Sequence, residues 1–265
     1  MSEIRFDDRV AVITGAGGGL GKTYAVEFAK RGGKVVVNDL GGAAEGSGGG
    51  NSMADQCVKE ITEAGGTAVA NYDSVATPEG GEAIIQTALD NFGQVDIVVN
   101  NAGSSTVEPA LNYTREQVAK ELELNLLAPY ELARLAARTM VDADRAGVII
   151  NIGSILGAVA GGKIRVPGYA AAKGGLHQIT RELAVEWARK QIRVNAIAPA
   201  WFETEMTAAE MFGSDAGMRY IEDNTPMGRP GRADELDGAL LFLASDASSY
   251  VTGHTLFVDG GWTAV

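Results

Sequence analysis

Seven short runs of apolar and β-branched residues alternate with longer segments of helical periodicity, and this alternation leaves few folds open to the chain. Parallel strands need long crossover connections, which helices supply, so the pattern is typical of a parallel α/β sheet. Nearly continuous apolar runs such as VAVIT and KVVVN indicate a doubly wound sheet, in which helices cover both faces of each strand. We expect strands at Val10–Thr14, Lys34–Asn38, Thr67–Asn71, Ile97–Asn100, Val148–Ile152, Arg193–Ala198 and Thr255–Val258, and helices at Leu20–Arg31, Ser52–Ala64, Pro78–Phe92, Thr114–Val141, Tyr169–Arg189 and Arg232–Ala244.

Two segments lack either period, and we interpret both as loops. Gly41–Asn51 reads GGAAEGSGGGN, and its glycines favour a mobile connection after the second strand. Ala200–Thr225 is longer than an ordinary connection and mixes aromatic and Met residues with charges. We interpret residues 200–225 as a lid over a substrate pocket, and the alternative is a pair of surface helices with their apolar face in the core.

The composition limits the classes of function. No linker or abrupt change of charge divides the 265 residues, so we expect residues 1–265 to form a single domain. A net charge of -12 disfavours nucleic-acid binding. We expect no membrane association, because the amino terminus has no apolar signal core and no apolar run could span a bilayer. Cys57 has no partner for an internal disulfide, which fits a cytoplasmic location, and no metal is expected because His177 and His254 lack metal-ligand spacing.

The first expected strand ends in TGAGGGLG, residues 14–21, which leads directly into a helix. Glycines let the backbone turn sharply and approach a pyrophosphate, and the free amides of the helix supply positive potential. A glycine run alone is weak support for a dinucleotide-binding loop, but its place between an apolar strand and an amphipathic helix strengthens the interpretation. The candidate cofactor contacts in this loop are Gly15, Gly17, Gly19, Leu20 and Gly21.

A carboxylate, Asp39, follows the second expected strand. It would accept a hydrogen bond from a ribose 2′-hydroxyl and repel a 2′-phosphate, and Gly18 stands where a phosphate-binding arginine would be. The sequence therefore favours NAD over NADP, and the alternative is that Asp39 only forms a turn. Asp73 is a candidate acceptor for the adenine amino group, or else a solvated loop residue. Further candidate contacts are their neighbours Leu40 and Ser74.

Tyr169 and Lys173 are four residues apart in a helical segment, so both side chains project from one face. A nearby ammonium favours phenolate, which would make the tyrosine a usable base near neutral pH by lowering its pKa. Ser154 follows an apolar strand at the carboxyl edge of the sheet, where it could hydrogen-bond a substrate oxygen. The alternatives are an exposed Tyr and Lys pair and a serine that caps a helix or turn.

Pro129 lies four residues after Asn125 in the expected long helix. Because proline has no N–H to donate to the Asn125 carbonyl, we expect a kink and a free carbonyl there. Such a carbonyl could hold an ordered water that passes protons toward Lys173. The alternative is a kink that only curves the helix around the core.

These motifs together resemble the short-chain dehydrogenase/reductase family over essentially the whole chain: TGAGGGLG (14–21), NNAG (100–103), Asn125, Ser154, YAAAK (169–173) and IRVNAIAP (192–199). The resemblance implies a Rossmann-like sheet of seven mainly parallel strands in the order 3-2-1-4-5-6-7, with helices on both faces. It also implies NAD-dependent interconversion of a secondary alcohol and a ketone, and a homotetramer.

The resemblance further implies a catalytic tetrad. Tyr169 would be the general acid/base and Ser154 would orient the substrate. Lys173 would hold the ribose hydroxyls and lower the tyrosine pKa, while Asn125 would support the relay water. The cofactor contacts that it implies are Asn101, Ala102, Gly103, Tyr169, Lys173, Pro199, Phe202 and Thr204.

Two departures from the family pattern bear on the substrate. Ala200 stands where glycine is common, and Ser154 lies farther from Tyr169 than is usual, which predicts an enlarged loop over Gly157–Gly168. The cations in that loop could meet a substrate carboxylate or phosphate, or could simply be solvated. They are Lys163 and Arg165.

The amino-terminal part, from VVVNDLGG to VANYDSV, is similar to the (3R)-hydroxyacyl-CoA dehydrogenase unit of peroxisomal multifunctional enzymes. The carboxyl-terminal part instead looks like stand-alone bacterial oxoacyl reductases and sugar-alcohol dehydrogenases. A 3-hydroxyacyl substrate is therefore a hypothesis beside sugar, steroid and cyclic alcohols. A non-catalytic NAD(H)-binding regulatory protein is the alternative from another class.

Overall fold

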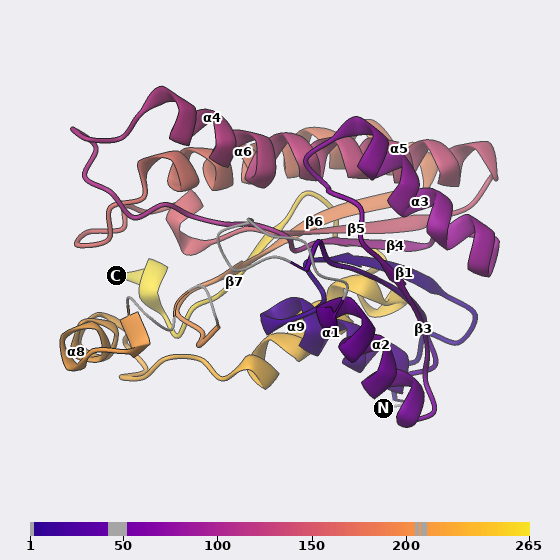
Figure 1. Cartoon of the computed structure of the whole chain (residues 1–265), viewed down its shortest axis with the longest axis horizontal. Coiled ribbons are helices and arrows are strands. Elements are labelled where there is room, and N and C mark those ends of the chain that lie inside the picture. The colour runs from indigo at the N-terminus through magenta and orange to yellow at the C-terminus, as the bar shows by residue number, and fades with distance from the viewer. Residues whose placement is uncertain (1–2, 42–51, 205–206, 208–210) are drawn as a thin grey trace.

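The computed structural model describes residues 3–41, 52–204, 207 and 211–265. They contain one seven-stranded sheet in the order β3-β2-β1-β4-β5-β6-β7, and every neighbouring pair is parallel (Figure 1). This strand order confirms the expected one. The strands are β1 (Val10–Thr14), β2 (Lys34–Asn38), β3 (Thr67–Asn71), β4 (Ile97–Asn100), β5 (Gly147–Ile152), β6 (Ile192–Pro199) and β7 (Thr255–Val258).

Helices cover both faces of the sheet (Figure 1). Successive side chains of a strand point to opposite faces, so Ala11 and Ile13 pack in one core and Val10 and Val12 in the other. The first core is closed by α1 (Gly19–Lys30), α2 (Ser52–Glu63) and α9 (Asp237–Ala244). The second is closed by α3 (Pro78–Phe92), α5 (Ala128–Asp142) and α6 (Pro167–Trp187).

The helix expected over Thr114–Val141 is not continuous. It consists of α4 (Arg115–Leu122), a π-helical turn at Glu123–Leu127 and then α5. Pro129 has no N–H for the carbonyl four residues earlier, and the preceding Ala128 N–H donates to the carbonyl of Glu123, five residues back. The expected interruption is thus present, but as a wider turn that contains Asn125 rather than as a simple kink.

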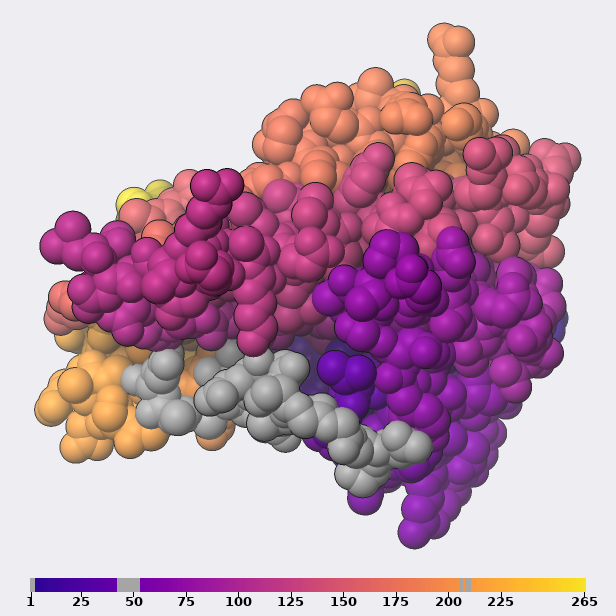
Figure 2. Space-filling model, turned by 45° about the horizontal axis from the view of Figure 1, so that its top comes forward, coloured from indigo at the N-terminus to yellow at the C-terminus, as the bar shows by residue number. Residues whose placement is uncertain are grey.

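The segment expected to be a loop at Ala200–Thr225 contains a helix, α8 (Asp215–Asn224), whose Ser214 hydroxyl caps the N–H of Gly217. Residues 205–206 and 208–210 of this segment, and 42–51 of the other expected loop, lie outside the described residues. In the space-filling view, α8 (orange) lies at the same end of the molecule as α4 (magenta), away from α2 and α3 (purple) (Figure 2).

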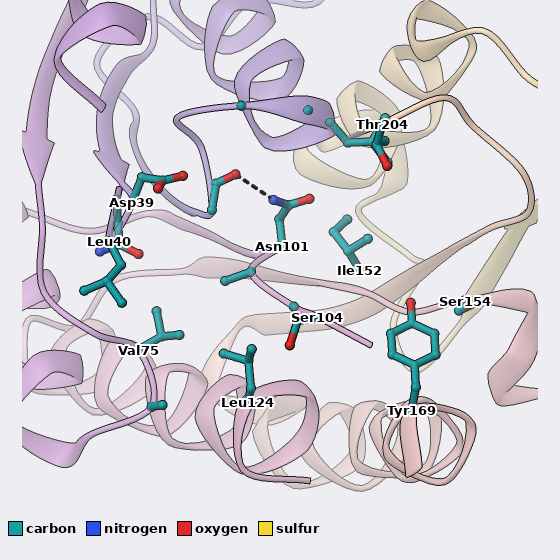
Figure 3. A pocket seen from close by; sticks show the side chains of 18 of the residues that line it. Asp39, Leu40, Val75, Asn101, Ser104, Leu124, Ile152, Ser154, Tyr169 and Thr204 are labelled. Carbon is teal, nitrogen blue, oxygen red and sulfur yellow. Dashed lines mark hydrogen bonds between the residues drawn. The ribbon is translucent and has the colours of Figure 1, made fainter. Parts of the chain in front are cut away.

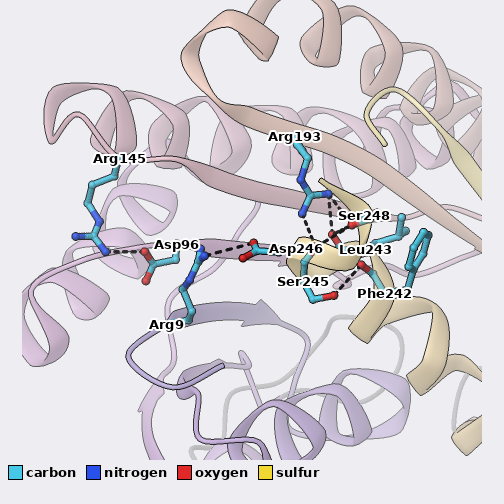
Figure 4. Close-up of polar contacts among 9 residues, drawn as sticks. All are labelled: Arg9, Asp96, Arg145, Arg193, Phe242, Leu243, Ser245, Asp246 and Ser248. Carbon is cyan, nitrogen blue, oxygen red and sulfur yellow. Dashed lines mark hydrogen bonds and ion pairs between the residues drawn. The ribbon is translucent and has the colours of Figure 1, made fainter. Parts of the chain in front are cut away.

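A partly buried arginine ties the end of α9 to the sheet (Figure 4). The Arg193 guanidinium on β6 donates to the carbonyls of Leu243 at 3.0 Å and Ser245 at 3.1 Å, and to the Ser248 hydroxyl at 2.9 Å. These carbonyls lie at the carboxyl end of α9, where backbone acceptors lack helical partners. Arg193 therefore caps α9 from a neighbouring strand.

Replacing Arg193 with Met is expected to lower the free energy of unfolding by about 3 kcal/mol, because several acceptors lose a charged donor. Urea denaturation measures the change. Arg9→Met is the matched control, since Arg9 lies 3.6 Å from Asp246, whose side chain is 92% exposed. That control should change stability by about 0.5 kcal/mol or less. Equal losses in both variants would contradict the capping role.

Candidate active site

A cavity of about 460 Å³ lies at the carboxyl ends of the strands. Residues that follow β1, β2, β4, β5 and β6 line it, from Asp39 at one end to Tyr169 at the other (Figure 3). Parallel α/β sheets bind ligands at this edge, where the connections to the helices diverge. The fold thus brings the glycine loop and the Tyr169 region to one pocket.

The glycine loop takes a backbone conformation that only glycine adopts readily. Gly15 has φ of +61° and Gly19 has φ of +50°, and both line the cavity together with Leu20. α1 begins at Gly19, so its first N–H groups and positive dipole end lie beside the cavity. Gly21 does not line the cavity: a Cβ there would lie 2.2 Å from the Gly15 carbonyl oxygen, so this glycine permits close packing of the loop.

Asp39 is held by the backbone around it. Its carboxylate accepts hydrogen bonds from the N–H of Gly17 at 2.8 Å and of Gly41 at 2.8 Å. A Cβ on Gly17 would lie 2.8 Å from the Asp39 Cγ, so glycine is needed for this approach. Gly17 lies outside the cavity lining and acts by fixing Asp39, which lines the cavity beside Leu40.

A chain of polar contacts fixes the wall of the cavity near Asp39. Asn38 Nδ2 donates to the Asp73 carbonyl at 2.9 Å, and Asn71 Nδ2 donates to the Asp73 carboxylate at 2.8 Å. Asp73 and the adjacent Ser74 both line the cavity. Asp73 is thus hydrogen-bonded at the cavity wall and is also exposed to solvent.

The segment after β4 is tied to the glycine loop. The Thr14 hydroxyl accepts hydrogen bonds from the N–H groups of Asn101 and Ala102, both at 3.0 Å. The Asn101 side chain donates to the Thr14 carbonyl at 2.9 Å and to the Gly15 carbonyl at 3.0 Å, and Figure 3 shows the second of these bonds. Asn101, Ala102 and Gly103 all line the cavity, as the NNAG motif predicts.

Tyr169 projects from the first turn of α6 toward the side of the pocket that carries Ser154 (Figure 3). Loss of surrounding water raises the pKa of Tyr169 to about 12, a hydrogen bond with Ser154 acts in the opposite direction, and the Glu121 carboxylate raises the pKa further. Ser154 also accepts from the Leu156 N–H at 3.1 Å, so it caps a short 3₁₀ turn as well as facing the pocket.

Lys173 is buried one turn along α6 from Tyr169. Its ammonium lies 5.5 Å from the centre of the Tyr169 ring and donates to the Ile152 carbonyl at 2.7 Å. Burial lowers the pKa of Lys173 to about 8. That Lys173 lowers the Tyr169 pKa stays a prediction: desolvation of the phenol raises that pKa in this structure, and the ammonium donates to a backbone carbonyl.

Asn125 is fully buried and lies behind the cavity wall rather than in its lining. Its Nδ2 donates to the carbonyls of Ser104 at 2.9 Å and Glu121 at 3.0 Å. Its Oδ1 has no hydrogen-bond partner among the described residues and lies against Gly103, where a Cβ would come within 2.6 Å. A buried acceptor without a partner costs free energy, so this oxygen has capacity for a further hydrogen bond.

Three buried polar side chains set how α6 lies on the sheet. Asn100 on β4 donates to the Asn151 side chain on β5 at 2.8 Å, and Asn151 donates to the Thr180 hydroxyl on α6 at 2.9 Å. Thr180 in turn donates to the Leu176 carbonyl at 2.8 Å. This chain fixes the helix that carries Tyr169 against the two central strands.

On the carboxyl-terminal side, the cavity is lined by Pro199, Phe202 and Thr204, as expected. Thr207 also lines it and was not predicted; its hydroxyl donates to the Phe202 carbonyl at 2.7 Å. No motif marks the other lining residues that the sequence reasoning missed. They include Val75, Ser104, Leu124 and Ile152 (Figure 3), which are apolar or small, and the charged residues Lys120 and Glu123.

Among the described residues, no helix is both long enough and apolar enough to cross a membrane. No group of three or more His, Cys, Asp or Glu side chains there could hold a metal ion.

The comparisons with known proteins cover the whole chain. A family described as enoyl-(acyl carrier protein) reductase matches residues 15–263. The chain is 34% identical to the 2-dehydro-3-deoxy-D-gluconate 5-dehydrogenase of Escherichia coli over 264 residues, which cover 100% of this chain and 99% of that protein.

Two longer relatives are more similar in sequence. The peroxisomal hydratase-dehydrogenase-epimerase of Saccharomyces cerevisiae is 48% identical over 196 residues, which are 74% of this chain and 21% of that protein. Peroxisomal multifunctional enzyme A of Dictyostelium discoideum is 45% identical over 261 residues, 98% of this chain and 55% of that protein. The chain thus spans only part of either relative. The likeness to multifunctional enzymes extends beyond the amino-terminal part, where the sequence analysis placed it.

Among solved structures, a gluconate 5-dehydrogenase from Burkholderia cenocepacia in complex with NADP and tartrate has a TM-score of 0.90 at 35% identity. The match covers 99% of this chain and 98% of that one. The sequence comparison and the structure comparison therefore both match sugar-acid dehydrogenases.

Proposed function

Because the chain belongs to the short-chain dehydrogenase/reductase family, and is therefore an oxidoreductase of alcohols and ketones with a nicotinamide dinucleotide cofactor, we propose that Tyr169 is its acid/base and NAD its preferred cofactor. The observation that carries this proposal is the convergence of Ser154, Tyr169 and Lys173 with the glycine loop in one cavity. A non-catalytic NAD-binding protein would have no use for that set of side chains.

The cavity fits a dinucleotide in its shape and donors. Positive-φ glycines and the start of α1 lie beside it, and Asp39 is fixed at the far end from Tyr169. When bound, the nicotinamide gives or takes the hydride. The residues that would hold the cofactor are Gly15, Gly19, Leu20, Asp39, Leu40, Asp73, Ser74, Asn101, Ala102, Gly103, Tyr169, Lys173, Pro199, Phe202 and Thr204, with Gly17 and Gly21 shaping the loop.

In ketone reduction, the Tyr169 hydroxyl donates its proton to the carbonyl oxygen as hydride arrives at the carbon. In alcohol oxidation, phenolate removes the hydroxyl proton. Ser154 holds the substrate oxygen and stabilises the charge that develops on it. Because burial raises the pKa of Tyr169, formation of phenolate relies on the Lys173 ammonium and on the positive charge of the oxidised nicotinamide.

Asn125 completes the proposed set from behind the cavity. Its unpartnered Oδ1 lies against Gly103, and a Cβ on Gly103 would also be 3.7 Å from the Lys173 ammonium. A water held by Asn125 would therefore be close enough to exchange protons with Lys173. By this route Tyr169 would take up a proton from solvent after ketone reduction, or release one to solvent after alcohol oxidation.

The NAD preference rests on Asp39. Its carboxylate is fixed by two backbone N–H groups at the place where a 2′-substituent would lie, and it would repel a phosphate there. The neighbouring cation Lys22 is paired with Glu60 at 2.7 Å. The Burkholderia structure contains NADP, so this preference is specific to the residues of this chain rather than to the family.

For the substrate we propose a 3-hydroxyacyl or 3-oxoacyl compound. The higher sequence identity is to the multifunctional enzymes, and the cavity lining includes apolar side chains that suit an acyl chain, among them Leu124, Ile152 and Phe202. Since Phe202, Thr204 and Thr207 also line the cavity, we propose that residues 200–225 close over the substrate as a lid. A sugar alcohol is the alternative that the Escherichia coli relative favours.

The test is a spectrophotometric assay with NAD, NADP and their reduced forms on a panel of 3-hydroxyacyl-CoA esters, sugar alcohols and cyclic alcohols. We expect NAD-dependent turnover, fastest with the acyl esters. Binding of NADH without turnover of any compound would favour the non-catalytic alternative.

We also propose that residues 1–265 work as one domain, in a homotetramer in the cytoplasm. Apolar side chains are exposed on α5, α6 and β7, namely Tyr130, Val185 and Phe257, which is typical of surfaces that pair in oligomers. Size-exclusion chromatography with light scattering should give four times the monomer mass of 27.6 kDa. A monomer at micromolar concentration would contradict this proposal.

A further inference from the structure

A buried carboxylate lies beside the proposed acid/base and was not singled out in the sequence. Glu121, in the last turn of α4, is 2% exposed. Its Oε1 accepts a hydrogen bond from the Thr106 N–H at 2.5 Å, and its Oε2 accepts one from the Tyr113 hydroxyl. The carboxylate thus joins α4 to both ends of the segment 106–113, which follows the cofactor-binding NNAG motif.

The same carboxylate packs against the start of α6. A Cβ on Gly168 would lie 2.1 Å from Glu121 Oε2, so the helix approaches the carboxylate directly before Tyr169. Proximity to the helix N-terminus favours a negative charge there. Glu121 also contributes to the raised pKa of Tyr169.

Few other charges act on the phenol. Lys173 on α6 lies under the ring but donates to the Ile152 carbonyl. His177, one turn further, is neutral near pH 7, because burial and Lys173 lower its pKa to about 4. Lys120 and Glu123 line the same cavity from α4 and the π-helical turn.

The loop before α6 also carries two cations. Lys163 lies over the Tyr220 ring at 5.3 Å, and Arg165 is exposed. Lys163 is thus held at the Tyr220 ring on α8, whereas Glu121 is among the groups that raise the Tyr169 pKa.

We infer that Glu121 is a positioning residue that fixes the start of α6 and keeps Tyr169 in its phenol form by placing a buried negative charge beside it. The inference rests on the proposed function of Tyr169. A nearby negative charge disfavours phenolate and favours the neutral phenol, which is the form that donates a proton to a ketone. Phenolate, the form needed for alcohol oxidation, then appears only at higher pH. Glu121 would thereby set the pH at which the phenol gives way to phenolate, and with it the position of both limbs of the pH profile.

The test is Glu121→Gln, which keeps the size and an acceptor for Thr106 but removes the charge. The pH profile of kcat/KM is measured with saturating cofactor in both directions. We expect the ascending limb of oxidation and the descending limb of reduction to move together to lower pH by at least about 0.5 unit, which is about a threefold change in rate at a fixed pH on the limb.

Tyr113→Phe is the matched control, since it removes one hydrogen bond to Glu121 and leaves the charge in place. It should leave both limbs where they are in the unmodified enzyme. An unchanged profile in Glu121→Gln, or an equal displacement in Tyr113→Phe, would overturn the inference, because either outcome means that Glu121 only holds the loop.

A second measurement needs no substrate. Tyrosinate absorbance is titrated in the NAD complex of each protein and compared with the same protein carrying Tyr169→Phe, which isolates Tyr169 from the other tyrosines. We expect Tyr169 to ionise at lower pH in Glu121→Gln. If the proposed activity fails on every substrate, this titration still decides the inference.

Discussion

Replacing Tyr169 with phenylalanine is expected to lower kcat by about 10³-fold or more, while the affinity for NAD stays within a factor of about three. The phenol is the proton donor and acceptor in the proposed reaction, and phenylalanine keeps the ring that lies over the Lys173 ammonium. Stopped-flow and steady-state assays with the best substrate of the panel measure the first quantity, and fluorescence titration with NADH measures the second.

Tyr220→Phe is the control for this experiment. Tyr220 belongs to the same aromatic surroundings, and its hydroxyl donates to the Gly161 carbonyl at 3.2 Å, outside the cavity lining. The control should keep kcat within about threefold of the unmodified enzyme. Retention of most activity in Tyr169→Phe would remove Tyr169 as the acid/base.

Replacing Asp39 with Ala is expected to lower the ratio of kcat/KM for NAD to that for NADP by about 100-fold. Two effects combine: the ribose hydroxyls lose an acceptor, and a 2′-phosphate no longer meets a like charge, which costs several kcal/mol at short range. Steady-state kinetics with both cofactors at constant ionic strength give the ratio, since charge effects at a partly exposed site depend on salt.

Asp39→Asn separates charge from loop structure, because it removes the charge and keeps a side-chain acceptor for the Gly17 or Gly41 N–H. It should shift the cofactor ratio in the same direction, with a smaller loss of thermal stability than Asp39→Ala. An unchanged ratio in both variants would refute the assignment of Asp39 to the ribose.

The strands were predictable because each combines a short apolar run with flanking turn residues, and β1, β2, β3, β4 and β7 have the bounds that the pattern gives. The break in the helix after Leu122 was harder to predict. The sequence shows that Pro129 lacks a donor, but not how the neighbouring N–H groups pair again, which depends on the packing of α4 against α6.

The site residues also differ in how far the sequence could predict them. Motif residues such as Gly15, Asp39 and Tyr169 were predictable because local spacing places them at the carboxyl edge of the sheet. Glu121 was not, because its partners Thr106 and Tyr113 come from a segment without a motif. Desolvation of the Tyr169 phenol, which raises its pKa, was not predictable either, since it depends on the surroundings in three dimensions and not on the spacing to Lys173.

The chain of Asn100, Asn151 and Thr180 has a consequence for how this protein can change over evolutionary time. Substituting any member leaves a buried polar atom of its neighbour without a partner, so single replacements are harmful although a joint apolar replacement can be tolerated. Neutral substitution is therefore restricted beneath α6, the helix that carries Tyr169, while side chains that contact the substrate remain free to vary. New specificities can arise on this scaffold without disturbing the placement of its reactive phenol.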